Sequence, residues 1–107
     1  MRIEFSENAV EALKEIYNFL YSKNERAATV IRNSILNEIK RLLVFPQMAS
    51  IEPILKEESE MFRSLVIEPY YKVVYYVDRE TIIVVDIWDC RQDPEKLRKR
   101  TTKKRNN

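Results

Sequence analysis

The stretch MFRSLVIEPYYKVVYYVDRETIIVVDIWD, residues 61–89, decides the fold of this chain. It is rich in Val, Ile, Tyr and Phe, and the short breaks Pro69-Tyr70 and Arg79-Glu80 divide it into three segments. β-branched and aromatic residues favour extended backbone, and two-residue breaks leave room only for tight turns. The sequence therefore predicts an antiparallel meander of three strands, at residues 61–68, 71–78 and 81–89.

The second hairpin of this meander has one register that separates apolar from polar side chains. It sets Val73 opposite Ile87, Tyr75 opposite Val85 and Val77 opposite Ile83. Sliding by one residue would place Val73 against Asp86 and bury a carboxylate, which is costly without a partner. We therefore expect the apolar face to be the core. The other face should stay open to solvent, with Lys72, Tyr76 and Trp88 exposed on it.

The residues before the meander predict one strand and two helices. Residues 2–5 alternate between polar and apolar, which indicates a short strand that joins the same sheet. Ser6 and Asn24 are favourable N-cap residues, and they precede predicted helices over 7–22 and 25–44. The short link between the helices predicts an antiparallel hairpin. The apolar stripes of the two helices are Val10, Leu13, Tyr17 and Leu20, and Ala28, Ile31, Ile35, Ile39 and Leu42.

Together these elements predict a single α+β domain over residues 1–100. In this domain the N-terminal strand and the helical hairpin pack on one face of an antiparallel sheet. Residues 46–60 contain two prolines and an acidic run, and they predict an irregular crossing from the hairpin to the meander. Asp93-Pro94 suits the cap and first position of a short basic helix that ends near Arg100. Residues 101–107 are predicted to be a disordered basic tail.

The composition excludes several kinds of active site. The 107 residues include no histidine and no glycine, and the one cysteine is Cys90. A Ser-His-Asp triad, an imidazole general base, a P-loop and a glycine-rich dinucleotide turn are therefore excluded, as are an internal disulfide and a structural zinc site. The acidic residues offer no convincing set of three metal ligands. We expect no metal and no cofactor.

Charge is unevenly distributed along the chain. The net charge is +2, but residues 91–107 contain eight basic and two acidic residues, whereas residues 1–90 carry a net charge of −4. A basic segment on an acidic body predicts a polyanionic partner, either a nucleic acid or an acidic protein segment. The chain lacks a signal-peptide pattern and any apolar run near the ~18 residues of a membrane span. With its lone cysteine, this predicts a cytoplasmic protein without membrane contact.

Three stretches of the sequence resemble the RelE/ParE superfamily of type II toxin–antitoxin toxins. FSENAVEALKEIYNFL is similar to the opening strand and helix of the family, and IIVVDIWDCRQDPEKL to its closing strand, with Arg91 and Asp93-Pro94 at matching places. The stretch FRSLVIEPYYKVVYYV is similar to the central part of the family motif, in which the matching residues are Arg63, Tyr71, Lys72 and Tyr75. The resemblance covers roughly residues 2–98, and it rests on the order and spacing of all three stretches.

The resemblance implies a cytoplasmic bacterial toxin that is neutralised by a cognate antitoxin. RelE-like members are small ribonucleases that cut mRNA on the ribosome. ParE-like members have the same scaffold without the cleavage residues, and they inhibit DNA gyrase. The implied antitoxin is a disordered, acidic and amphipathic segment that folds over the helices and the sheet.

Candidate catalytic residues follow if the chain is RelE-like. Lys72 aligns with a family arginine that stabilises the phosphate, Arg91 matches a second one, and Arg63 remains where the family has a lysine pair. The tyrosine or histidine expected in the C-terminal segment is missing, since position 97 is leucine. Metal-free RNA cleavage needs an acid and a base as well as cations. The ParE-like branch, which acts by binding rather than as an enzyme, is therefore favoured over a ribosome-dependent endoribonuclease.

A third alternative is a non-toxic protein of the same fold that binds only an antitoxin or operator DNA. For any binding role, cationic and aromatic side chains of the open sheet face and the basic segment are the candidates: Tyr76, Trp88, Lys96, Arg98, Lys99 and Arg100. The expected partners are an antitoxin and either DNA gyrase or the ribosome with its mRNA. Both a homodimer and a toxin–antitoxin hetero-oligomer are compatible with these features.

Overall fold

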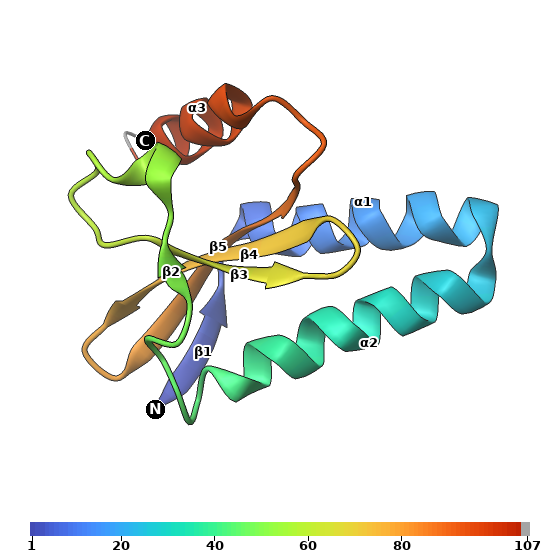
Figure 1. Ribbon diagram of the computed structural model, residues 1–107, viewed down its shortest axis with the longest axis horizontal. Helices are drawn as coiled ribbons and strands as arrows, with labels where there is room; N and C mark the ends of the chain where they lie inside the picture. Colours follow the sequence, from blue (N-terminus) through green and yellow to red (C-terminus); the bar gives the residue numbers. More distant parts are fainter. Residues whose placement is uncertain (106–107) are drawn as a thin grey trace.

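The computed structural model describes residues 1–105 of the chain and the side chains of residues 1–102. Over these residues the chain forms one sheet, three α-helices and a 3-10 turn (Figure 1). This organisation confirms the predicted α+β class. The elements in chain order are β1 (Arg2–Phe5), α1 (Glu7–Lys23), α2 (Glu25–Arg41), β2 (Ser50–Ile51), η1 (Pro53–Leu55), β3 (Arg63–Ile67), β4 (Tyr71–Asp78), β5 (Thr81–Asp89) and α3 (Pro94–Arg105).

The sheet has five strands in the order β1-β5-β4-β3-β2. β3, β4 and β5 form the predicted antiparallel meander. β1 lies beside β5 and runs parallel to it, so the N-terminal strand joins the sheet as expected. β2 is a two-residue strand at the other edge, inside the segment 46–60 that the sequence predicted to be irregular.

The helical hairpin begins where the sequence predicted it. The Ser6 hydroxyl accepts a hydrogen bond from the Ala9 amide, and Asn24 Oδ1 accepts one from the Ala27 amide, both at 3.1 Å. Each cap satisfies an amide that has no partner within the first turn of its helix. The predicted caps of α1 and α2 are therefore confirmed.

The hairpin packs on one face of the sheet and encloses the main core (Figure 1). α2 ends at Arg41, three residues before the predicted end, because the amides of residues 42–44 bond to carbonyls three residues back. Such tight turns replace the regular helix as the chain approaches Pro46. The large buried residues of the main core are Ile35, Ile39, Leu42, Tyr71, Val73, Tyr75, Ile82, Val84 and Ile87.

A β-bulge changes which residues of β5 face the hairpin. Val73 pairs with Ile87 as predicted, but the register shifts just before Tyr75, which pairs with Val84 rather than Val85. Val84 therefore lies in the main core, and the Val85 side chain packs on the opposite face. The predicted register is correct up to the bulge and wrong beyond it.

Ser6 provides the physical reason for this bulge. Its amide donates to the Val84 carbonyl at 2.9 Å, and its hydroxyl donates to the Val85 carbonyl at 2.8 Å. Two successive carbonyls of β5 thus bond to the corner between β1 and α1, whereas carbonyls of a regular strand alternate in direction.

The second face of the sheet is covered, so the expectation of an open face is wrong. α3 and η1 lie across it and enclose a smaller core (Figure 1). Trp88, predicted to be exposed, is 2% exposed. The cover is possible because η1 and α3 each present a leucine to the sheet. The buried residues of this core are Leu55, Phe62, Val74, Trp88 and Leu97.

α3 starts at the predicted position, with Asp93 as its cap. It continues to Arg105, whereas the sequence predicted an end near residue 100. Leu97 and Thr101 are one turn apart on the helix and both are buried, so the contact with the second face extends beyond the predicted end. Most of the predicted tail, 101–107, is therefore helical, and its last two residues lie outside the described part of the chain.

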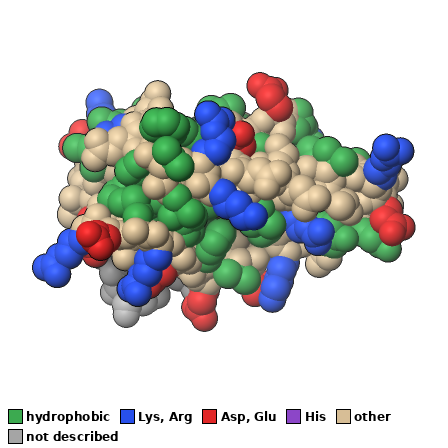
Figure 2. Space-filling model, turned by 90° about the horizontal axis from the view of Figure 1, so that it is seen from below, with side chains coloured by type: hydrophobic (Ala, Val, Ile, Leu, Met, Phe, Trp, Pro, Cys, Tyr) green, Lys and Arg blue, Asp and Glu red, His purple; other side chains and the backbone are tan. Residues whose placement is uncertain are grey.

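Figure 2 shows apolar side chains gathered on part of the face that is seen from below. The exposed apolar residues include four of the α2–β2 connection, namely Leu43, Val44, Phe45 and Met48.

Two side chains form hydrogen bonds to the backbone of the α2–β2 connection and fix its position. Arg63 Nη1 donates to the Ala49 carbonyl at 2.7 Å, and the Tyr75 hydroxyl donates to the Pro46 carbonyl at 2.9 Å.

Candidate functional site

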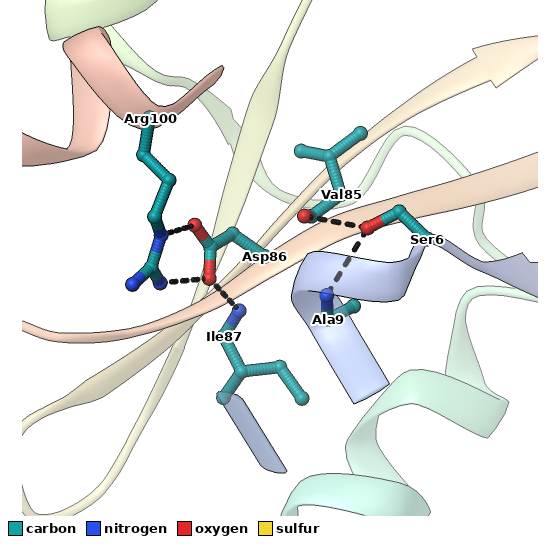
Figure 3. Close-up of polar contacts among 6 residues, drawn as sticks. All are labelled: Ser6, Ala9, Val85, Asp86, Ile87 and Arg100. Carbon is teal, nitrogen blue, oxygen red and sulfur yellow. Dashed lines mark hydrogen bonds and ion pairs between the residues drawn. The ribbon is translucent and has the colours of Figure 1, made fainter. Parts of the chain in front are cut away.

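Asp86 of β5 forms a buried ion pair with Arg100 of α3 (Figure 3). Asp86 is 1% exposed, and its carboxylate accepts bonds from Nε of Arg100, at 2.8 Å, and from Nη2. The Arg100 guanidinium also lies over the ring of Trp88, 4.9 Å from its centroid. Burial raises the pKa of Asp86, and the guanidinium opposes that rise. The ion pair between Asp86 and Arg100 therefore stabilises the packing of α3 on the sheet.

Lys72 of β4 is paired with Glu52 on the same face of the sheet. Glu52 is 2% exposed, and Lys72 pairs with its Oε1 atom. The second carboxylate oxygen, Oε2, accepts a hydrogen bond from the Ile54 amide at 3.1 Å, and this bond caps η1. The Lys72 side chain is 18% exposed. A buried carboxylate strongly favours keeping its ammonium partner. The predicted phosphate-stabilising cation is therefore engaged within the chain.

Arg91 follows β5 and is exposed, but it also has partners. Its guanidinium bonds to Asp89 through Nε at 3.0 Å and Nη2 at 2.7 Å, and it stacks on Tyr70, with Cζ 3.7 Å from the ring centroid. The bidentate bond lowers the pKa of Asp89. Arg91 and Phe19 of α1 line one hollow on the hairpin side, whereas Lys72 lies on the α3 side. The two cations therefore do not share a face.

The other predicted site residues also differ in position. Arg63, the third candidate for catalysis, holds the α2–β2 connection through Ala49. Tyr76 is half-buried and packs edge-on against Phe62, with ring centroids 5.4 Å apart. Trp88 is buried and cannot stack on a base while α3 lies over it. The predicted binding residues that are exposed on α3 are Lys96, Arg98 and Lys99.

Residues 3–94 match a family model described as the ParE toxin of the type II toxin–antitoxin system parDE. The chain belongs to this ParE toxin family. The match confirms the predicted ParE-like branch of the RelE/ParE superfamily and places the chain among the toxins of type II toxin–antitoxin systems. The matched range ends at Pro94, the first residue of α3.

A solved structure, the chromosomal ParDE TA system from P. aeruginosa, has a similar fold. It superposes with a TM-score of 0.67 and 21% sequence identity, over 81% of this chain and 92% of that chain. A likeness at this identity shows a shared fold. No curated protein matches this ParE-family chain.

A groove between β1 and the hairpin is a feature of this ParE-family chain that sequence reasoning missed. Its volume is about 420 Å³, and its lining is mainly apolar. The sequence contained an indication of this groove. The predicted apolar stripe of α1 included Val10, but Val10 is 40% exposed, and Ala9 and Ala12 are the α1 residues that are buried. α1 has more apolar positions than the sheet covers. The groove residues are Phe5, Val10, Leu13, Lys14, Tyr17, Asn18, Arg32 and Leu36.

Among the residues that the structure describes, no three side chains of the types His, Cys, Asp and Glu come together as metal ligands. No helix among those residues is long and apolar enough to cross a bilayer. Cys90 is exposed, and partial desolvation of its thiol raises the pKa of the thiol above its ordinary value.

Proposed function

We propose that the chain is a cytoplasmic toxin that arrests bacterial growth by binding DNA gyrase, and that a cognate antitoxin neutralises it. Membership of the ParE toxin family supports this proposal. The observation that carries binding rather than catalysis is the pairing of Lys72 with Glu52. A cation that stabilises a phosphate during cleavage must face the substrate, whereas Lys72 faces a buried carboxylate.

The remaining candidates for RNA cleavage support the same conclusion. Arg91 is held by Asp89, and Arg63 is held by a backbone carbonyl. Burial raises the pKa of Tyr71 to about 12 and also raises the pKa of Tyr75. Both tyrosines are buried in the main core, where a substrate cannot reach them, and a raised pKa makes each a weaker acid, so neither is suited to general acid–base catalysis.

Two surfaces are suited to the proposed partners. The exposed Lys96, Lys99 and Arg98, the last of which is paired with Glu95, give α3 a face with a net positive charge that would contact an acidic surface of the target. The groove beside β1 combines an apolar lining with Lys14 and Arg32. This combination suits the apolar face of an acidic amphipathic antitoxin helix that folds on binding.

Two measurements test the proposal. Producing the chain without an antitoxin should stop bacterial growth, and the purified chain should inhibit supercoiling by gyrase in vitro. Lys99→Glu should weaken that inhibition about tenfold, because it reverses a charge of the proposed contact. The matched control is Arg26→Glu, which reverses an exposed charge on α2 and should leave inhibition unchanged.

Different outcomes would support the alternatives. Cleavage of mRNA in translating ribosomes, lost in Arg91→Ala, would identify a RelE-like endoribonuclease instead. A chain that leaves growth unaffected would be a non-toxic partner for an antitoxin or for operator DNA.

A further inference from the structure

β1 has a free edge. It lies at the end of the sheet order and pairs only with β5 among the described strands. The amides of Arg2 and Ser6 donate to carbonyls of the β4–β5 turn and β5, both at 2.9 Å. Because the hydrogen-bonding groups of successive residues point to alternate sides, those of Ile3 and Phe5 point away from β5. They form a row of donors and acceptors along the outer edge.

The side chains of β1 separate by type between the two faces. Arg2 and Glu4 lie on one face, where they form an exposed ion pair at 3.0 Å. Ile3 packs against the main core, and Phe5 lines the groove beside the hairpin, so both lie on the other face. Met1 is two residues before Ile3, so the alternation of the strand places it on the same face as Ile3 and Phe5, and it is half-exposed. The strand therefore has one charged face and one apolar face.

We propose that two copies of this chain associate through their β1 edges, antiparallel about a two-fold axis at Ile3. In this arrangement Ile3 exchanges both backbone hydrogen bonds with Ile3 of the second copy. The Phe5 amide donates to the Met1 carbonyl of the second copy, and symmetry repeats this bond. The two sheets become one continuous sheet with both helical hairpins on the same side. This association goes beyond the proposed function and does not depend on a gyrase target.

Charge complementarity selects this register. Arg2 lies opposite Glu4 of the second copy, in a non-hydrogen-bonded pair where side chains approach most closely. A register centred on Glu4 would set two glutamates against each other, which is unfavourable. On the apolar face, Ile3 lies against Ile3 of the second copy, and Phe5 lies against Met1 of the second copy. The strand is therefore complementary to itself on both faces.

The opposite edge of the sheet lacks these properties. β2 has two residues, and the chain turns into η1 at Pro53, which has no amide to donate. β1 is also short, so the buried area is modest even when the exposed parts of Phe5 and Val10 are included. We expect a weak dimer with a dissociation constant of roughly 10–1000 μM.

Charge exchange tests the proposal. Sedimentation equilibrium of the purified chain should show concentration-dependent dimers. Glu4→Arg should weaken association by about tenfold or more, because it sets two arginines against two arginines. The double variant Arg2→Glu/Glu4→Arg should restore dimers, since each charge again faces its opposite. Glu57→Arg is the matched control and should dimerise like the unmodified chain, because Glu57 is exposed outside β1.

Hydrogen exchange gives a second readout, because a change of surface charge alone would not protect particular backbone amides from exchange. The Ile3 and Phe5 amides should exchange slowly when the chain is dimeric and rapidly when it is dilute. A chain that stays monomeric up to about 1 mM would overturn the proposal. Protection of these amides only on addition of an antitoxin segment would also overturn it, in favour of a foreign strand at this edge. Dimers that persist unchanged in Glu4→Arg would show that another surface associates.

Discussion

Arg100 of α3 and Asp86 of β5 form an asymmetric ion pair, because Asp86 is 1% exposed whereas the Arg100 side chain is 37% exposed. If the pair were broken, the guanidinium could turn to solvent, but the carboxylate would stay buried under α3. An unpaired buried charge costs more than an unpaired exposed one. The position of α3 on the sheet therefore depends strongly on the arginine.

This asymmetry predicts the effect of removing each partner. Arg100→Met should lower the free energy of unfolding by about 2–4 kcal/mol, because it leaves the Asp86 carboxylate buried without a partner. Asp86→Asn should cost less, and Asp86→Leu in the Arg100→Met background should recover most of the loss. Urea unfolding measures each value, with Arg98→Met as an exposed control on the same helix that should be neutral. An Arg100→Met variant as stable as the unmodified chain would contradict the prediction.

The same pair predicts a pH dependence of stability. Burial raises the pKa of Asp86 above the ~3.9 of an unfolded aspartate, so the folded chain keeps this proton to higher pH than the unfolded chain. The contribution of Asp86 to stability is therefore greatest below the unfolded pKa and falls as pH rises through the folded pKa. Without Arg100 the pKa of Asp86 should rise further.

Urea unfolding of the unmodified chain and of Arg100→Met, followed from the ~3.9 of an unfolded aspartate up to neutral pH, measures this effect. The stability of Arg100→Met should continue to fall at pH values where that of the unmodified chain has become constant. Asp86→Asn has no proton to lose and should lack this dependence. Parallel pH profiles of the unmodified chain and Arg100→Met would argue against the predicted shift.

Sequence patterns predicted the parts of the fold that depend on neighbouring residues. The Ser6 and Asn24 caps act within three residues, and the meander follows from strand-forming residues separated by two-residue breaks. The bulge in β5 could not be predicted in this way. It depends on the Ser6 hydroxyl meeting the Val85 carbonyl, 79 positions along the chain.

The covered second face was missed for a related reason. α3 has the sequence PEKLRKRTTKKR, in which Leu97 is the one apolar residue, and such a pattern is typical of a solvated helix. Its docking depends on Arg100 reaching Asp86 and Trp88, which no local pattern indicates. The candidate cations Lys72, Arg91 and Arg63 were identified by resemblance. Their partners could not be identified in this way, because Glu52 and Ala49 lie on other segments and Asp89 lies across the turn that follows β5.

Lys72 and Glu52 should be energetically coupled. Lys72→Met should lower the free energy of unfolding by roughly 2–4 kcal/mol, because Glu52 would remain buried without its ammonium. Lys56→Met, at an exposed lysine just after η1, is the matched control and should be neutral. A double-mutant cycle with Glu52→Gln should give a coupling of at least ~1 kcal/mol. Inhibition of gyrase per folded molecule should survive in Lys72→Met, and its complete loss would assign Lys72 a direct functional role.

Arg91 should control the titration of Asp89. The bidentate bond lowers the pKa of this carboxyl, so Arg91→Gln should raise it towards the ordinary value. Asp89 contributes stability above the unfolded pKa and loses it as pH falls through the folded pKa, and Arg91→Gln should weaken this acid sensitivity. Carboxyl carbon chemical shifts measured by NMR give the pKa directly. Arg98→Gln, which removes an arginine that pairs elsewhere, should leave the Asp89 titration unchanged.

Trp88 should report whether α3 lies on the sheet. It is the one tryptophan of the chain and is buried beneath α3, so its fluorescence should be blue-shifted and poorly quenched by iodide. Leu97→Asp places a charge in the smaller core and should detach α3, because a buried unpaired carboxylate is strongly unfavourable. The emission should then shift to longer wavelength, and quenching should increase, while circular dichroism still shows α1 and α2. Leu43→Asp introduces the same charge at an exposed leucine and should leave both readouts unchanged. If Trp88 were equally shielded in Leu97→Asp, its burial would not depend on α3, and the helix would not be the cover of this face.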